Sequence, residues 1–242
     1  MDENAEKIHK LLLPLLLECK KVCEKNDIWY SLAYGSVLGA VRHNGFIPWD
    51  LDADVFLLLP DKQRFREAFA ADDHGEILLK NCETTPRCTQ SHDSLIYKNP
   101  KIKVHLDLYP LVGAPSLEKE RDKFTFWSYY LDRIIRSKYT DIRKCKPKNR
   151  LMVLGSKILT ILIPDDFLKK NIYYRENMVP FSDAKYLTDL GCDNRSKGCI
   201  PREIMLDVVD HEFEGELFKI PRRYDEYLRR TYGDDYMTPK KY

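Results

Sequence analysis

The chain has 242 residues, of which 43% are hydrophobic and 32% charged, a composition typical of a soluble globular protein with a sizeable core. Its 40 Lys and Arg residues nearly balance its 38 Asp and Glu residues, so no field of one sign marks it as a nucleic-acid-binding protein. Its seven cysteines are scattered without a C-x-x-C pair, which favours reduced thiols over a disulfide framework. A zinc site of Cys82, Cys88, Cys192 and Cys199 is a minor alternative, because these spacings do not fit the common zinc motifs.

Neither a secretory signal nor a membrane-spanning helix is expected. The first six residues, MDENAE, are acidic where a secretory signal would be basic. The apolar runs 11–17 and 151–163 are both shorter than the ~20 residues that a spanning helix needs. Together with the unpaired cysteines, these features predict a cytoplasmic protein.

The N-terminal half alternates helical and extended patterns. Apolar residues at three- and four-residue spacing predict a helix over 3–25, in which Pro14 either produces a kink or starts the helix. A buried strand over 28–33, a short helix or turn over 37–42 and a loop over 43–49 are expected next. The remaining elements of this half are a strand over 53–59, a helix over 62–71, and strands over 77–82, 94–98 and 102–108.

The C-terminal half is mainly helical in pattern. Its expected elements are helices over 116–138, 151–163 and 165–177, a hairpin over 212–220, and a last helix that Pro221 opens and that ends near residue 232. We predict an α/β (α+β) protein with a mixed-sheet core. The core with its N-terminal helix is expected at 1–115, and a helical region at 116–242 packs on it as one compact unit.

Three aspartates at alternate positions form the most informative feature of the sequence. Asp50, Asp52 and Asp54 stand directly before the apolar run 55–59. Because alternate residues of a strand share one face, the three carboxylates can converge. Like charges at this spacing repel one another, and a divalent cation such as magnesium or manganese relieves that repulsion with hard oxygen ligands. Such a site suits phosphoryl transfer, although a solvated turn is the competing interpretation.

A glycine-serine pair precedes the aspartates, between one buried strand and the next. Gly35 allows a close approach to the backbone, and Ser36 at a helix start offers a hydroxyl and free amides to a phosphate. Arg42 and His43 follow closely and are candidate partners for phosphate charge. The aromatic residues Phe46 and Trp49 either stack on a base or pack the loop.

The stretch from Tyr34 to Asp54, YGSVLGAVRHNGFIPWDLDAD, closely resembles the signature of the LicD family, which includes phosphocholine transferases and fukutin-related ribitol-phosphate transferases. Segments 104–110 and 213–234 resemble further parts of that family, whereas 120–200 matches only loosely. The family fold is a divergent nucleotidyltransferase. Leu51 stands where the family usually has another Asp, and 81–99 also departs from the family pattern.

The resemblance implies a set of site residues. Asp52 and Asp54 are the implied metal ligands, and Asp107 is the implied third carboxylate, which is also a candidate to take the proton of the acceptor hydroxyl. The implied cofactor is Mg²⁺ or Mn²⁺. The substrate-binding residues predicted from sequence are Gly35, Ser36, Arg42, His43, Trp49 and Asp50.

The resemblance also implies a reaction. Family members move a phospho-alcohol such as phosphocholine from a cytidine-diphosphate donor to a sugar hydroxyl of a cell-surface or lipid-linked glycan. Two alternatives stay open. A conventional nucleotidyltransferase would attach a nucleotide to a small molecule, and a non-catalytic regulator would keep only the fold. The long segment from Gly35 to Asp54 favours phospho-alcohol transfer, and the intact carboxylates disfavour the regulator.

A dense basic stretch runs from Arg133 to Arg150, directly before the amphipathic segment 151–163. A solvated helix end with core packing is one interpretation. The other is contact of 133–163 with an anionic glycan or with the inner face of a membrane. His105, which alternates with Asp107, is equally consistent with a structural or a catalytic role.

Overall fold

A computed structural model of the protein describes residues 3–192 and 195–239. Its internal contacts divide the chain into two units. The first unit comprises residues 1–79, 94–111 and 200–242, and the second comprises 80–93 and 112–199. This division does not coincide with the expected boundary after residue 115, because the C-terminal segment belongs to the first unit with the N-terminal helix.

The first unit begins with helix α1 (Glu3–Lys25), whose buried face contains Leu12, Leu16 and Cys23 at helical spacing. Pro14 lies inside this helix, so it does not start it. Helices α2 (Tyr34–His43) and α3 (Lys62–Ala71) and the 3₁₀ turn η1 (Leu59–Asp61) follow. Of these, α2 begins three residues earlier than expected and therefore includes Gly35 and Ser36 in its first turn.

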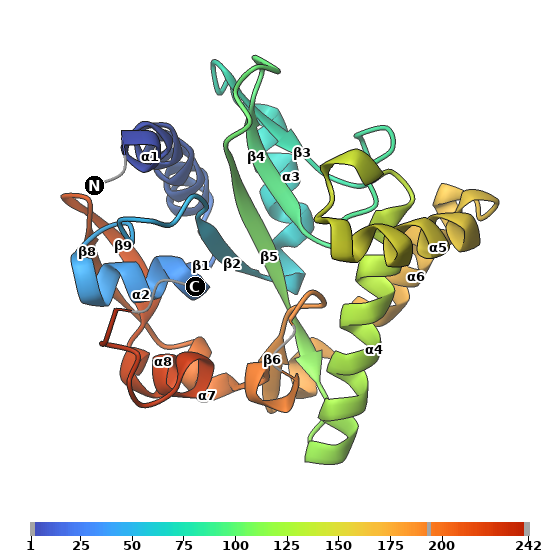
Figure 1. Cartoon of the computed structure of the whole chain (residues 1–242). Coiled ribbons are helices and arrows are strands. Elements are labelled where there is room, and N and C mark those ends of the chain that lie inside the picture. The colour runs from blue at the N-terminus through green and yellow to red at the C-terminus, as the bar shows by residue number, and fades with distance from the viewer. Residues whose placement is uncertain (1–2, 193–194, 240–242) are drawn as a thin grey trace. The chain divides into compact units, whose positions relative to one another are not determined.

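A mixed sheet forms the centre of this unit (Figure 1). Its strands are β1 (Tyr30–Leu32), β2 (Asp54–Leu58), β3 (Ile77–Lys80), β4 (Asp93–Tyr97) and β5 (His105–Ala114), in the spatial order β1-β2-β5-β4-β3. β1 is antiparallel to β2, and β2 is parallel to β5. Leu32, Leu95, Leu106 and Leu108 are completely or almost completely buried within it. The predicted α/β fold with a mixed sheet is confirmed.

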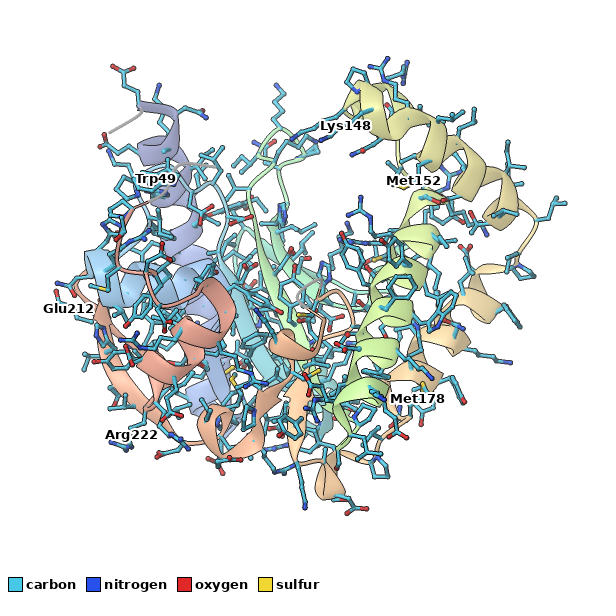
Figure 2. The ribbon with its side chains drawn as sticks, turned by 60° about the horizontal axis from the view of Figure 1, so that its bottom comes forward. Trp49, Lys148, Met152, Met178, Glu212 and Arg222 are labelled. Carbon is cyan, nitrogen blue, oxygen red and sulfur yellow. The ribbon has the colours of Figure 1, made fainter. Side chains whose placement is uncertain are left out.

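The C-terminal segment of the first unit comprises β7 (Ile200–Pro201), α7 (Arg202–Met205), the hairpin β8 (Val208–Phe213) and β9 (Glu216–Pro221), and α8 (Tyr224–Tyr232). Figure 2 labels Glu212 on β8 and Arg222 just after β9. The hairpin turn, Glu214–Gly215, has φ angles of 55° and 79°, and two positive φ angles are typical of two-residue hairpins. The expected hairpin is present but longer. Pro221 ends β9 and does not open the last helix.

The second unit is mainly helical. It contains α4 (Glu118–Ser137), α5 (Arg150–Ile161), α6 (Asp165–Glu176), β6 (Tyr186–Thr188) and the 3₁₀ turns η2 (Ile142–Lys144), η3 (Pro147–Asn149), η4 (Phe181–Asp183) and η5 (Arg195–Gly198). β6, which the sequence did not predict, pairs antiparallel with residues 112–114 of β5. The three predicted helices are confirmed within a few residues. Among the described helices, none is both long enough and apolar enough to cross a bilayer.

Candidate functional site

The start of helix α2 is joined to the start of strand β2. Ala33 N donates to Asp54 O at 2.9 Å, and Asp54 N donates to Ser36 Oγ at 3.0 Å. The Ser36 amide donates to Ala33 O at 2.9 Å, so it is not free for a phosphate as we expected. Ser36 is buried, and its contacts fix the backbone of Asp54.

Tyr34, the first residue of α2, has a φ angle of 45°, which side-chain-bearing residues rarely adopt. Its amide donates to the Tyr227 hydroxyl of α8 at 3.0 Å, and its ring packs edge-on against Phe56 at 5.0 Å and Tyr109 at 5.9 Å. Backbone strain of this kind costs about 1–3 kcal/mol and concentrates at functional sites. α8 and the sheet together hold this strained turn in place.

Gly35 leaves room for the Asp50 carboxylate. A Cβ atom at position 35 would lie 2.9 Å from Asp50 Oδ2, which is closer than real Cβ contacts. The close approach of the Asp50 carboxylate therefore explains why position 35 is occupied by glycine. The glycine-serine pair and the aspartates, which the sequence separates by 14 positions, are in direct contact in the folded protein.

The loop between α2 and β2 is anchored from both ends of the chain. His9 Nε2 lies 2.8 Å from the Asp50 carbonyl oxygen, and the His9 ring stacks on Phe46 with centroids 4.5 Å apart. Phe46 N donates to Glu214 Oε1 at 2.9 Å, and Glu214 N donates to Asn44 O at 2.8 Å. Of the two interpretations of Phe46, packing is the one that the structure supports, because its ring is buried against His9 and Phe213.

Asp50 and Asp52 interact with each other. Burial, the neighbouring charge of Asp52 and a hydrogen bond with Asp52 together raise the pKa of Asp50 to about 6. The same aspartates affect Tyr232 of α8. The pKa of the Tyr232 phenol is raised, mainly by burial and then by the charges of Asp54, Asp50 and Asp52. Asp50 and Asp52 therefore interact directly, and all three predicted aspartates act on the phenol of Tyr232.

Asp107 lies beside Asp54, because the two residues are partners in the parallel pairing of β2 and β5. Side chains at paired positions of parallel strands emerge on the same face of the sheet. Ser94 Oγ donates to Asp107 Oδ1 at 2.7 Å, and the Tyr109 hydroxyl donates to Oδ2 at 3.4 Å. His105 is half-exposed, and its Nε2 atom lies 3.8 Å from Asp107 Oδ2. These contacts fix the orientation of the Asp107 carboxylate.

The carboxylates suit a hard divalent cation in chemistry, since repulsion among them is what such an ion relieves. Asp54 and Asp107 lie side by side on adjacent strands, and Asp50 and Asp52 share a hydrogen bond. Within residues 3–192 and 195–239, however, no three His, Cys, Asp or Glu side chains converge on a common metal position. Magnesium or manganese at Asp52, Asp54 and Asp107 therefore stays a prediction.

A cavity of about 300 Å³ adjoins this group, at the lower end of the range for ligand sites. Its lining includes Gly35, Arg42, Trp49 and Asp50 from the motif, and Tyr232, Asp235, Tyr236 and Thr238 from the C-terminal segment. Four of the six predicted substrate-binding residues thus line one cavity. Ser36 and His43 do not contribute to its lining.

Arg42 and His43 form a connected pair. Arg42 Nε donates to His43 Nε2 at 2.9 Å, and Arg42 Nη1 donates to the Tyr236 carbonyl at 2.8 Å. Burial and the charge of Arg42 lower the pKa of His43, so the neutral imidazole is favoured. His43 also packs edge-on against Trp49, with centroids 6.2 Å apart. His43 therefore orients Arg42 and Trp49, and Arg42 carries the positive charge at the cavity.

Several site residues were not predicted from the sequence. His9, Glu214 and Tyr232 contact or influence the motif from positions far away in the chain, and Ser94 binds Asp107 from the adjacent strand. His9 had a local signal, its position on the buried face of α1, where a polar residue requires a partner. Glu214 and Tyr232 lie in segment 213–234, whose resemblance to the family was the available signal.

A mixed sheet with carboxylates on neighbouring parallel strands, preceded by a helix that starts at Gly-Ser, defines a domain of the nucleotidyltransferase type. The chain belongs to the LicD/FKTN/FKRP nucleotidyltransferase-domain family, whose sequence profile matches residues 27–152. This match covers the whole glycine-serine and aspartate motif as well as Asp107, and it confirms the resemblance to the LicD family.

Known relatives support the same assignment. The chain is 27% identical over 234 residues to the lipopolysaccharide cholinephosphotransferase LicD of Haemophilus influenzae, covering 88% of this chain and 84% of that protein. It is 28% identical over 89 residues to the human ribitol 5-phosphate transferase FKRP, covering 37% of this chain and 18% of that protein. These relatives confirm the expected enzyme class, a LicD-like phosphotransferase.

Proposed function

We propose that this protein transfers a phospho-alcohol such as phosphocholine from a cytidine-diphosphate donor to a hydroxyl group of a glycan. The observation that carries the proposal is the pair of carboxylates, Asp54 and Asp107, side by side on parallel strands, together with Asp50, which lines the cavity. The similarity to a lipopolysaccharide cholinephosphotransferase along 88% of the chain supports the substrate class.

In the proposed reaction, the acceptor hydroxyl oxygen forms a bond to the phosphorus that bears the alcohol. The bond from that phosphorus to the bridging oxygen of the diphosphate breaks, and cytidine monophosphate leaves with the electron pair. Asp107 takes the hydroxyl proton, in an orientation held by Ser94. Asp52, Asp54 and Asp107 are the residues that would hold Mg²⁺ or Mn²⁺, which neutralises phosphate charge when bound.

The remaining cavity residues bind the donor in this proposal. Arg42 contacts donor phosphate, and the Trp49 ring stacks on the cytosine base. The structure limits how far either side chain can move, because His43 contacts both of them. Such positioning matters because phosphoryl transfer depends chiefly on orientation and charge neutralisation.

Product analysis tests the reaction directly. The protein is incubated with cytidine diphosphocholine, cytidine diphosphoribitol or cytidine triphosphate, together with glycan extracts and Mg²⁺ or Mn²⁺, and products are identified by mass spectrometry. Release of cytidine monophosphate with a phospho-alcohol on the glycan is the expected result. Pyrophosphate release with a nucleotide on the acceptor would contradict it and would indicate a conventional nucleotidyltransferase.

Arg42→Lys is expected to lower kcat/KM by roughly tenfold or more, because lysine keeps the charge but cannot make the two directed bonds to His43 and Tyr236. Steady-state kinetics with the preferred donor measure the effect. Arg64→Lys is the matched control, since Arg64 lies on the exposed surface of α3. Unchanged kinetics in Arg42→Lys would assign Arg42 a packing role.

We also propose that helix α5 contacts the anionic inner face of a membrane. Large apolar side chains of α5 are exposed: Leu151 and Ile158 are 81% and 64% exposed, and Leu162, directly after the helix, is 90% exposed. Two of its polar residues face the protein: Thr160 is buried, and Lys157 Nζ donates to the Thr140 carbonyl at 3.1 Å. Residues 141–170 carry eight Lys or Arg residues against three Asp, which suits an anionic surface. Figure 2 labels Lys148 and Met152 in this region.

Vesicle co-sedimentation measures this contact. The protein is expected to bind phosphatidylcholine vesicles that contain phosphatidylglycerol, and Ile158→Ser with Leu162→Ser should weaken that binding by about tenfold or more, because two exposed apolar side chains are lost. Leu217→Ser is the control, since Leu217 is an exposed leucine of the β8–β9 hairpin. Absence of vesicle binding, or a dimer in solution that the two changes dissociate, would contradict the membrane assignment.

A further inference from the structure

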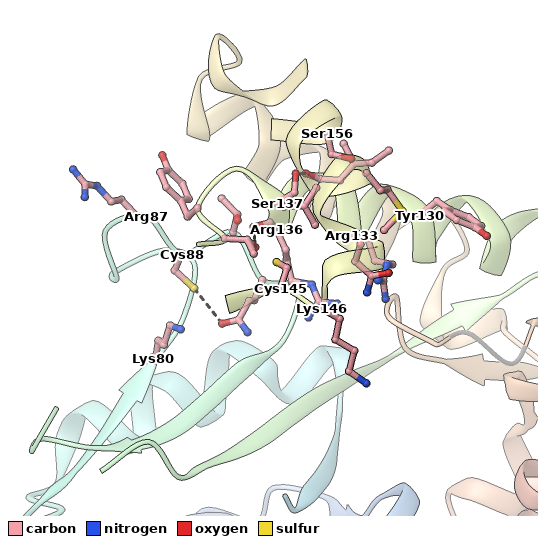
Figure 3. A pocket seen from close by; sticks show the side chains of 18 residues that line it. Lys80, Arg87, Cys88, Tyr130, Arg133, Arg136, Ser137, Cys145, Lys146 and Ser156 are labelled. Carbon is pink, nitrogen blue, oxygen red and sulfur yellow. Dashed lines mark hydrogen bonds between the residues drawn. The ribbon is translucent and has the colours of Figure 1, made fainter. Parts of the chain in front are cut away.

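The second unit contains a cavity of about 640 Å³, well within the size range of small-molecule sites (Figure 3). Its lining comes from the loop between β3 and β4, the C-terminal half of α4, the connector after α4, and the first half of α5. All of these segments belong to the second unit. None of the residues assigned above to the metal or to the donor takes part in this lining.

The lining is strongly basic. Its five cationic residues are Lys80, Arg87, Arg133, Arg136 and Lys146, and no Asp or Glu is among the described residues that line it. Arg136 pairs with the buried carboxylate of Asp132, with 2.8 Å between Nε and Oδ2. In the described part of the chain, no carboxylate forms an ion pair with the other four. Cations that share a cavity without acidic partners repel one another, and a bound anion relieves that repulsion.

Aromatic side chains lie among these cations. Tyr130 and Tyr139 line the cavity and are 44% and 38% exposed, so their rings are accessible to a ligand. The Arg133 guanidinium is held in place, because it stacks over the Tyr129 ring at 5.3 Å and donates to the Tyr129 hydroxyl at 3.0 Å. Gln90 and Asn149 add amide groups that can bond to hydroxyls. Cations, amides and aromatic faces together suit a sugar that carries a phosphate better than they suit a bare anion.

We infer that this cavity binds a phosphate-bearing saccharide through Arg87, Arg133 and Lys146. The inference rests on the proposed function only in one respect, that the saccharide belongs to the glycan acceptor. The guanidinium groups bind the phosphate by paired N–H···O bonds, and the tyrosine rings cover the apolar face of the sugar. The second unit thereby selects acceptors that carry a phosphate.

Binding of glucose 1-phosphate to the full chain, without donor or metal, tests this site by calorimetry and thermal shift. Arg87→Glu and Arg133→Glu are each expected to weaken binding by about tenfold or more, because each substitution reverses a charge that lines the cavity. Both side chains are exposed, so neither substitution should disturb the core. Lys119→Glu, an exposed reversal on the same helix as Arg133, should leave binding unchanged. Glucose, which lacks the phosphate, should bind at least about tenfold more weakly than glucose 1-phosphate. Equal binding of glucose 1-phosphate by the cavity variants and the wild type would overturn the inference.

A phospholipid headgroup carries the same phosphate chemistry, and vesicles separate the two sources. Arg87→Glu and Arg133→Glu should reduce binding to phosphatidylglycerol vesicles no more than Lys119→Glu does. If they reduce vesicle binding and glucose 1-phosphate does not compete, the cavity holds a lipid headgroup and the saccharide inference is overturned. Because this binding assay needs no turnover, it can succeed when the proposed reaction fails, and product analysis can succeed when the cavity assignment fails.

Discussion

Replacing Asp54 by Asn is expected to lower turnover by more than about a hundredfold. Asp54 lies beside Asp107 on the neighbouring parallel strand, and its backbone is hydrogen-bonded to Ala33 and Ser36. Asn has the same shape but lacks the negative charge with which Asp54 would hold the proposed cation, the group that would neutralise phosphate charge. The free energy of unfolding should stay within about 1 kcal/mol of the wild-type value, because the substitution removes repulsion and leaves the backbone bonds intact.

The measurement is steady-state turnover at saturating Mg²⁺ or Mn²⁺, together with chemical denaturation of each variant. Asp210→Asn is the matched control, since Asp210 is an exposed aspartate of the hairpin whose partner is Lys219. Turnover of Asp54→Asn within a few-fold of wild type, at equal folded fraction, would remove Asp54 from the proposed site.

Gly39→Ala is expected to destabilise the protein by about 1–3 kcal/mol, although alanine favours helices more than glycine does. Gly39 lies inside α2, and a Cβ atom there would lie 2.4 Å from the carbonyl oxygen of Gly45. Because the opposing atom belongs to the backbone, no side-chain rotation relieves the clash. The loop that carries Asp50 must shift, so turnover should fall together with the melting temperature.

Gly155→Ala provides the opposite case. Gly155 also lies inside a helix, α5, but a Cβ atom there would meet no atom within 4 Å. Helix propensity alone should act at this position and stabilise the protein by about 0.5–1 kcal/mol. Thermal unfolding of both variants separates the steric effect from the propensity effect. A melting temperature of Gly39→Ala equal to or above that of Gly155→Ala would contradict the close contact between α2 and the loop.

The core of the site could be predicted from the sequence because its determinants are local. The apolar run after Asp54 predicted strand β2, and the pattern around Asp107 predicted its strand. Asp50 and Asp52 lie before β2, outside any strand, so the convergence of all three carboxylates on one strand face was not found. The anchors could not be predicted in the same way. His9 and Glu214 contact the loop from positions 41 and 168 residues away, and no local pattern encodes such pairings.

The other differences between the predicted and the observed elements also have local causes. β6 has three residues and α7 has four, too few for a periodic pattern to appear. The hairpin was expected to be shorter because Pro221 was assigned to a helix start, whereas it is the last residue of β9, at the strand end, where proline is tolerated. The Ser36 amide was expected to be free because α2 was predicted to begin after it.

Both ends of the chain meet at the loop that carries the aspartates, and this has a consequence for biosynthesis. Phe46 and its partner Glu214 are 168 positions apart, and Tyr34 and Tyr227 are 193 apart. At about 5–20 residues per second, a ribosome needs roughly 10–30 s to make the chain between the first pair. During that interval the motif has His9 but not its C-terminal partners Glu214 and Tyr227. The loop after α2 and the first turn of α2 therefore gain their contacts with Glu214 and Tyr227 only when the last segment of the chain has been made.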